Sequence, residues 1–294
     1  MLGFPIQYNE PLFRPPSEGR SLIIQITLGC SWNKCSFCEM YTSKQFTARK
    51  QEDIFADIDA FKLHSNSIQK VFLADGDPLV LSNKRLIPIL KKLNETFPKL
   101  RRISTYASPS NLMRKSIDEL KELKENGLVL LYVGIESGDS EVLEAIQKGE
   151  TYQTTVDGLN KSKAAGMDAS VMIINGVGGK LLTEQHAINS AKVLNATQPK
   201  FASTLVLTAH KGLDHYKNRY LGEFIELEES ELFEEMHLFL SHLELEETIF
   251  RSDHASNSLV LKGIIGRDKS SMLAQIEKAI QEGAGNRKRQ YHGC

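Results

Sequence analysis

Short apolar runs alternate with longer amphipathic stretches over most of the chain. Six of the apolar runs have the length of buried strands, and they cover residues 22–26, 71–73, 103–106, 129–135, 169–174 and 202–207. Between them lie segments with helix-like patterning, at residues 51–63, 84–97, 115–126, 139–165 and 183–196. In the second of these, apolar residues recur at helical spacing and give one buried face. Strands that alternate with helices predict parallel βα units joined by right-handed crossovers.

Six such units suit an incomplete barrel or an open doubly wound sheet, and periodicity alone does not distinguish the two. After residue 212 the pattern changes. The segment 212–224 is polar and loop-like, and it is followed by an acidic helix near 228–242, a short strand near 248–250 and a final helix near 268–281. The pattern therefore predicts an N-terminal extension (1–19), an α/β core (20–212) and an α-rich C-terminal extension (213–294) that packs on the core.

Composition places the chain among ordinary globular proteins. It has 294 residues, of which 41% are hydrophobic and 25% charged, so it can bury a sizeable core. The net charge of −1 creates no strong basic field that would attract nucleic acid or an anionic membrane. The one basic run, Arg287-Lys288-Arg289, lies in a terminal segment that we expect to be frayed. No signal peptide and no membrane-spanning run is recognisable, which favours a cytoplasmic location.

Three of the four cysteines lie within nine residues, directly after the first predicted strand: Cys30, Cys35 and Cys38. Thiolates on one tight loop can converge on a single metal centre. Structural zinc would need a fourth ligand, but Cys294 and the nearest histidine, His64, lie well beyond the loop. Three unrelated thiols are a second alternative, which the tight clustering disfavours. The third is an iron–sulfur cluster held by three cysteines, which leaves one iron open to a small-molecule chelator.

This loop resembles the cysteine motif of the radical S-adenosylmethionine (SAM) superfamily, which has an aromatic residue, here Phe37, just before the last cysteine. In that family the open iron binds the amino and carboxylate groups of the methionine part. The family spacing is C-x3-C-x2-C, whereas this chain has C-x4-C-x2-C. We expect the additional residue to bulge outward without moving the thiolates. The resemblance implies a [4Fe–4S] cluster on Cys30, Cys35 and Cys38, with SAM as the second cofactor.

Further motifs follow the next predicted strands in order. The turn Asp75-Gly76-Asp77-Pro78 resembles the family's Gly-Gly-Glu-Pro element, which implies that Gly76, Asp77 and Pro78 receive the methionine ammonium. Such a turn exposes carbonyl oxygens, and Asp77 adds an anionic acceptor. After the third strand, Ser108 and Asn111 offer a hydroxyl and an amide at the same edge, although a capping or turn role fits each residue by itself.

The segment 134–138 (GIESG) resembles the end of the fourth strand and the start of the following helix in one branch of the radical SAM superfamily. That branch contains methylthiotransferases, elongator-type enzymes and coproporphyrinogen-oxidase-like proteins. The resemblance implies that Glu136 accepts hydrogen bonds from the ribose hydroxyls or the methionine ammonium. Lys148 falls where that branch often carries a basic residue near the cofactor carboxylate. The glycine-rich end of the fifth strand resembles the adenine-contacting turn, where Ile174 and Val177 would pack on the ring and glycines would allow its close approach.

The resemblance covers residues 20–210 and implies a partial (β/α)6 TIM-like barrel, with the site at the carboxyl ends of the strands. It implies an Fe–S oxidoreductase-like enzyme that cleaves SAM reductively to a 5′-deoxyadenosyl radical, which takes hydrogen from a small-molecule substrate. Flavodoxin or ferredoxin is the expected electron donor, because no second cysteine set is available for an auxiliary cluster. Candidates for contact with the substrate are His210, which we expect to end the sixth strand, and a polar group in the C-terminal region that consists of Arg251, Asp253, His254 and Asn257. A surface role is the alternative for each of them.

Two other functions remain open. A non-catalytic iron–sulfur protein, which carries electrons or senses redox state, would need the cluster but not the motifs at 75–78, 134–138 and 176–179. An RNA-modifying radical enzyme is suggested by the segment 134–138, but such enzymes generally add a basic RNA-binding module, so nucleic acid is not the expected partner.

Overall fold

The computed structural model describes residues 5–283. The chain divides into two compact units, and each is interrupted along the sequence. The first unit contains residues 1–33, 38–133 and 160–169, and the second contains residues 34–37, 134–159 and 170–294. The cysteine loop is therefore shared, because residues 34–37 belong to the second unit and the flanking residues to the first.

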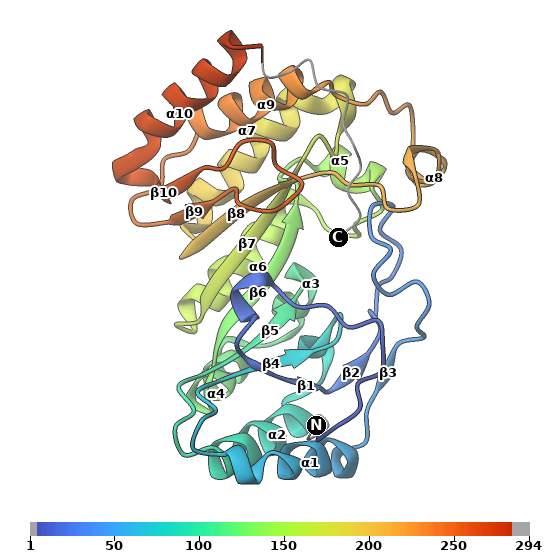
Figure 1. The fold of residues 1–294 in the computed structure, drawn as a ribbon, viewed down its shortest axis with the longest axis vertical. Helices are drawn as coiled ribbons and strands as arrows, with labels where there is room; N and C mark the ends of the chain where they lie inside the picture. The colour runs from blue at the N-terminus through green and yellow to red at the C-terminus, as the bar shows by residue number, and fades with distance from the viewer. Residues whose placement is uncertain (1–4, 284–294) are drawn as a thin grey trace. The chain divides into compact units, whose positions relative to one another are not determined.

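Parallel strands form the centre of the first unit. They follow the order β1 (Leu22–Gln25), β4 (Lys70–Ala74), β5 (Arg102–Ala107) and β6 (Leu128–Glu136), and the last of them continues into the second unit (Figure 1). The helices of this unit are α1 (Gln51–Ala60), α2 (Asn83–Thr96), α3 (Pro109–Arg114) and α4 (Ile117–Glu125). Short elements complete it: β2 (Thr27–Leu28) paired with β3 (Thr47–Ala48), and the 3₁₀ turns η1 (Pro16–Glu18), η2 (Lys62–His64) and η3 (Pro78–Val80).

The core of this unit follows from the apolar pattern. Strand β4 is a continuous apolar run in which Val71, Phe72 and Leu73 are fully buried, as expected for a strand of a parallel sheet that is covered on both faces. Helix α2 buries one face, as predicted, with Leu86, Ile89, Leu90 and Leu93.

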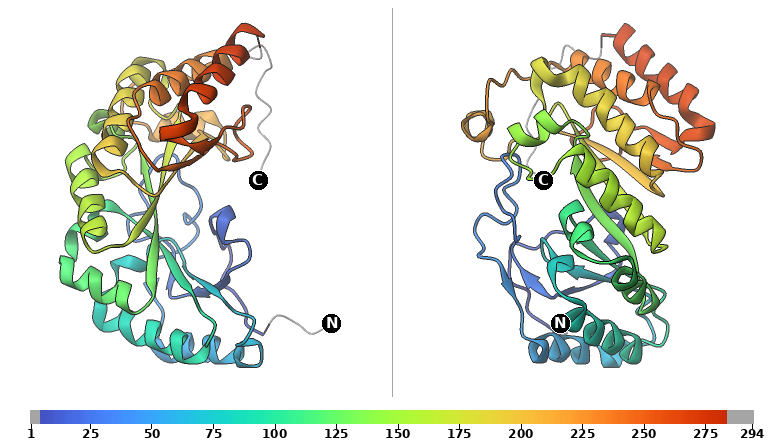
Figure 2. Two further views of the ribbon diagram at one scale, coloured as in Figure 1. Left: turned by 90° about the vertical axis from the view of Figure 1, so that its left-hand side faces the viewer. Right: turned by 180° about the vertical axis from the view of Figure 1, so that it is seen from behind.

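The second unit adds three parallel strands and one antiparallel strand. They follow the order β7 (Asp168–Asn175), β8 (Phe201–Val206), β9 (Ile249–Arg251) and β10 (Lys262–Ile264), and only the pair β9–β10 is antiparallel. The helices are α5 (Ser140–Ala145), α7 (Gly179–Thr197), α8 (Leu213–Arg219), α9 (Glu229–Ser241) and α10 (Ile265–Gln281). Helix α6 (Tyr152–Ala164) begins in this unit, and its residues from 160 onward belong to the first. Helix α9 packs against both α7 and α10, and in Figure 2 these three helices (yellow, orange and red) lie side by side.

All six predicted strands are confirmed, but one helix prediction and one loop prediction are wrong. The segment 139–165 is not one helix: α5 ends at Ala145, and Gln147 and Gly149 take left-handed conformations (φ +55° and +74°) before α6 begins. The segment 212–224, expected to be a loop, contains α8. Its few apolar residues, such as Tyr216, recur at helical spacing and are buried in a hydrophobic cluster.

No helix among residues 5–283 is long and apolar enough to cross a membrane. The cytoplasmic location and the domain limits at residues 19 and 212 stay predictions. The basic run 287–289 and Cys294 lie outside the described residues.

Candidate cofactor site

The three loop cysteines are in the thiol form and partly buried, and three thiolates are a donor set that suits an iron–sulfur cluster. Cys30 and Cys38 belong to the first unit and Cys35 to the second. Among the described residues, no group of three or more His, Cys, Asp or Glu side chains is close enough together to hold a metal ion. The cysteines as cluster ligands therefore stay a prediction from their motif.

The turn after β4 lies directly against the start of the cysteine loop. The Gly76 amide donates to the Gly29 carbonyl (3.1 Å), and the Ser31 hydroxyl donates to the carboxylate of Asp77. A Cβ atom at Gly76 would lie 2.7 Å from the ring of Tyr41 and 3.0 Å from the Cβ of Cys30. Only glycine therefore allows this turn to approach the first cysteine so closely.

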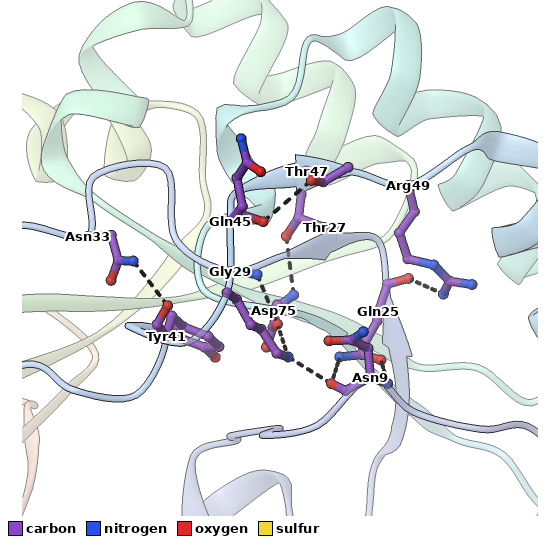
Figure 3. A network of polar contacts seen from close by, with 11 residues as sticks. Asn9, Gln25, Thr27, Gly29, Asn33, Tyr41, Gln45, Thr47, Arg49 and Asp75 are labelled. Carbon is purple, nitrogen blue, oxygen red and sulfur yellow. Dashed lines mark hydrogen bonds and ion pairs between the residues drawn. The ribbon is translucent and has the colours of Figure 1, made fainter.

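Asp75, which stands where the family motif has glycine, anchors the entry to the loop. Its carboxylate accepts from the Gly29 amide (3.1 Å) and from Lys44 Nζ (2.7 Å), and its own amide donates to Thr27 Oγ1 (3.2 Å; Figure 3). Both charged side chains are almost fully buried. Burial raises the pKa of Asp75, although the bonds from Lys44 and Gly29 oppose this. Asp75 thus fixes the backbone just before Cys30.

At the end of β6, Glu136 forms a buried ion pair with Lys148. Glu136 has a φ of +62° and is 4% exposed, and its Oε1 accepts from Lys148 Nζ at 3.0 Å. Burial lowers the pKa of Lys148, but the charges of Glu136 and Cys35 outweigh this and hold it above its ordinary value. The same ammonium lies 5.8 Å from the ring centroid of Phe37.

The second carboxylate oxygen of Glu136 is available to a ligand. Oε2 is buried and has no hydrogen-bond partner among residues 5–283. A buried acceptor without a partner is costly unless a ligand or water supplies a donor. A Cβ atom at Gly134 would lie 2.1 Å from Glu136 Oε1, so glycine at this position leaves space for the carboxylate.

The glycine-rich turn after β7 is hydrogen-bonded to a side chain of helix α9. The amide of Gly176, which has a φ of +77°, donates to Glu235 Oε1 at 2.7 Å. Ile174 and Val177 are buried in a hydrophobic cluster that includes Tyr216, whose hydroxyl donates to the Val177 carbonyl. Contact between these two apolar side chains and an adenine ring stays a prediction.

Ser108 and Asn111 form the capping box of α3. The Asn111 amide donates to Ser108 Oγ (3.2 Å), and the Ser108 amide donates to Asn111 Oδ1 (3.0 Å). Both residues therefore have the capping role that the sequence analysis gave as the alternative to cofactor binding. A role in cofactor binding stays a prediction.

The substrate candidates lie in the second unit, and the structure gives several of them local roles. Strand β8 ends at Val206, so His210 does not end it as expected, and His210 is exposed. Asp253 pairs with Lys262 (3.0 Å), Asn257 donates to the Thr204 carbonyl (2.9 Å), and Arg251 is exposed on β9.

His254 is the candidate whose titration is most affected. Burial lowers its pKa, Asp253 acts in the opposite direction, and His210 adds to the lowering, so these three groups are electrostatic neighbours. His254 Nδ1 also lies 2.8 Å from Ser256 Oγ. The structure thus brings together three of the five candidates.

Several residues of this region had no sequence signal. Three residues outside every motif form hydrogen bonds to the motif segments from distant parts of the chain: Lys44, Arg219 and Glu235. The buried ion pair of Lys44 and the buried carboxylate of Glu235 become visible only in the folded chain.

Comparison with known proteins decides the family. The profile of the Radical SAM superfamily matches residues 24–194. The chain belongs to this superfamily. The cofactors of this superfamily are a [4Fe–4S] cluster and SAM. The chain is therefore a radical SAM enzyme, and its family leaves the specific reaction open.

Individual relatives agree with the branch that the motifs suggested. The heme chaperone HemW of Bacillus subtilis is 24% identical over 179 residues, which are 60% of this chain and 46% of HemW. The tRNA-2-methylthio-N(6)-dimethylallyladenosine synthase of Psychrobacter cryohalolentis is 28% identical over 207 residues, 66% of this chain and 41% of the synthase. The chain thus spans less than half the length of these two relatives.

Solved structures establish the fold. Coproporphyrinogen III oxidase (HemN) from Escherichia coli superposes with a TM-score of 0.57 at 17% identity, and covers 75% of this chain and 52% of its own. Methylornithine synthase (PylB) superposes with a TM-score of 0.52 at 16% identity, and the match covers 92% of this chain and 83% of the synthase. The predicted α/β fold, a partial TIM-like barrel, is therefore confirmed.

Proposed function

We propose that this radical SAM enzyme cleaves SAM reductively and uses the resulting 5′-deoxyadenosyl radical to take a hydrogen atom from a small molecule. The observation that carries the proposal is the unsatisfied Oε2 of Glu136, buried at the end of β6. A ligand that donates hydrogen bonds, such as the ribose hydroxyls or the ammonium of SAM, would satisfy this oxygen.

The chain's own residues would share the work of binding and orientation. Thiolates of Cys30, Cys35 and Cys38 would hold the cluster and leave one iron open. Gly76 and Asp77 would meet the methionine ammonium beside Cys30. When bound, the cluster and SAM supply the electron transfer and the radical; the protein positions them and excludes water.

The electron would come from an external donor. The sequence contains four cysteines, three of them in the loop, so it has no second set for an auxiliary cluster. A flavodoxin or ferredoxin is the donor class that we propose, and replacement of dithionite by either protein in the assay below tests it.

Anaerobic turnover tests the proposal. Protein reconstituted with iron and sulfide, reduced with dithionite and given SAM should release 5′-deoxyadenosine and methionine. Alanine at Cys30, Cys35 or Cys38 should abolish both the cluster absorbance and the release. A wild-type protein that holds an intact cluster but makes no 5′-deoxyadenosine would favour an electron carrier or redox sensor instead.

A second candidate function is RNA modification. The match to the tRNA-2-methylthio-N(6)-dimethylallyladenosine synthase favours it, whereas the net charge of −1 gives no general attraction to RNA. Retention of the protein on immobilised tRNA at moderate salt would support this candidate, and elution at low salt would exclude it.

A further inference from the structure

Arg219, the last residue of α8, binds three successive carbonyl groups of the cysteine loop. Its Nη2 lies 2.9 Å from the carbonyl oxygen of Cys35 and 3.3 Å from that of Lys34, and its Nη1 lies 3.4 Å from that of Ser36. A guanidinium group carries five N–H donors in a rigid planar fork. One side chain thus fixes the direction of three peptide groups around the second cysteine.

Arg219 is itself held in place by its surroundings. Its carbonyl accepts from Gln147 Nε2 at 2.6 Å, and two residues further the Leu221 amide donates to the Ala145 carbonyl at 2.9 Å. The loop is tied to the same turn, because the Ser36 amide donates to the Ile146 carbonyl at 2.9 Å. The end of α8, the turn after α5 and the loop segment 34–37 therefore form one hydrogen-bonded junction, all within the second unit.

This junction falls where the cysteine motif departs from the family. The additional residue lies between Cys30 and Cys35, and a longer loop has more conformations to lose when it is ordered. Carbonyl groups gathered by one cation restrict that freedom. The guanidinium also places a permanent positive charge beside the backbone of Cys35.

We infer that Arg219 is a positioning residue for Cys35: it clamps the lengthened cysteine loop, and its charge favours the reduced, more negative state of the cluster bound there. The inference rests on the proposed function for the cluster, but the clamp itself exists without it. A positive charge near a cluster raises its reduction potential. Loss of Arg219 should therefore loosen Cys35 and lower the potential.

The first experiment uses metal-free protein, so it does not depend on the cluster. Anaerobic alkylation with iodoacetamide, at a pH at which all three thiols are ionised, is followed at each cysteine by mass spectrometry. In Arg219→Gln, Cys35 should react several-fold faster than in the wild type, whereas Cys30 and Cys38, whose carbonyl groups are not among the three that Arg219 binds, should keep their rates. Lys217→Ala removes an exposed charge from the same helix and should change nothing. Equal Cys35 rates in wild type and Arg219→Gln would overturn the clamp.

The second experiment uses reconstituted protein. Arg219→Gln should lose iron to a chelator several-fold faster than the wild type and show a lower midpoint potential in a redox titration. Arg219→Lys keeps the charge but not the fork, so its potential should stay near the wild-type value while its iron loss is intermediate. Unchanged iron loss and potential in Arg219→Gln would overturn the inference. Failure of the wild type to bind any cluster would instead contradict the proposed function and leave the alkylation result valid.

Discussion

Lys148 connects two residues that the sequence motifs treat separately. It is bonded to Glu136, at the end of β6, and its ammonium faces the ring of Phe37 and the charge of Cys35. The bond orients Glu136 by engaging Oε1, so that Oε2 is the oxygen left for a ligand. Lys148 is therefore the residue that sets the direction of the Glu136 carboxylate.

Lys148→Met should weaken SAM binding without preventing cluster assembly. The change leaves a buried carboxylate without its partner, and the removal of one partner of a buried charge pair costs about 2–5 kcal/mol, which corresponds to a loss in affinity of about 30-fold or more. Anaerobic equilibrium dialysis with labelled SAM measures the affinity, and iron content serves as the readout that should not change. Lys121→Met, on an exposed lysine of α4, is the control. Affinity within twofold of the wild type would show that Lys148 does not orient Glu136.

At the scale of elements, helices α7 and α9 contact the residues that follow β6 and β7 through a series of buried polar groups. Ser137 Oγ, next to Glu136, lies 2.8 Å from His186 Nδ1 on α7, and His186 Nε2 lies 3.8 Å from Glu235 Oε1 on α9. That oxygen accepts from the Gly176 amide, and Glu235 Oε2 accepts from Thr183 Oγ1 at 2.6 Å. The helices thereby link the end of β6 to the glycine turn after β7.

Glu235→Ala should loosen this turn and weaken nucleotide binding together. It leaves the buried Gly176 amide without an acceptor, and an unsatisfied buried group costs about 1–3 kcal/mol. Hydrogen exchange at residues 174–179 should speed up, and SAM affinity should fall. Glu234→Ala, on the exposed side of the same helix, is the matched control. Exchange at the turn that is no faster than in the control would contradict a supporting role for α9.

The elements that could be predicted from the sequence are those whose signal is local. The six strands are short, mostly apolar runs, and α2 repeats its apolar residues at helical spacing, so both follow from neighbouring residues. Helix α8 was missed because few apolar residues stand among many charged ones. Lys44, Glu235 and Arg219 were missed because their partners lie 31, 59 and 184 residues away along the chain. The motifs located candidate residues but not the groups that hold them.

At the scale of the whole molecule, the fold and the reaction are separate questions. A partial TIM-like barrel supports many chemistries at the carboxyl ends of its strands, so membership of the superfamily leaves the substrate open. The stability of such a barrel depends instead on its interior. In the first unit, a single carboxylate from the N-terminal segment, Glu18 in η1, is fully buried against several strands.

Glu18 accepts four hydrogen bonds. Its Oε1 accepts from Arg102 Nη2 (2.6 Å), Ser104 Oγ (2.9 Å) and the Tyr132 hydroxyl (2.6 Å), and the Ser21 hydroxyl donates to Oε2. Burial raises the pKa of Tyr132, and the bond to Glu18 adds to this, so the hydroxyl stays protonated and donates. The N-terminal segment is thereby tied to both β5 and β6.

Glu18→Ala should destabilise the first unit, because it leaves the partly buried guanidinium of Arg102 and the buried hydroxyl groups of Tyr132 and Ser104 without their acceptor. The loss of a buried ionic partner costs about 3–5 kcal/mol, which for a unit of this size lowers the midpoint by about 10 °C. Trp32 is the only tryptophan in the sequence and belongs to the part of the cysteine loop that lies in the first unit, so its fluorescence reports on unfolding there. The fluorescence transition should therefore move more than that of Glu95→Ala, which alters an exposed residue of α2. Coincident transitions in the two variants would mean that the strands hold together without this carboxylate.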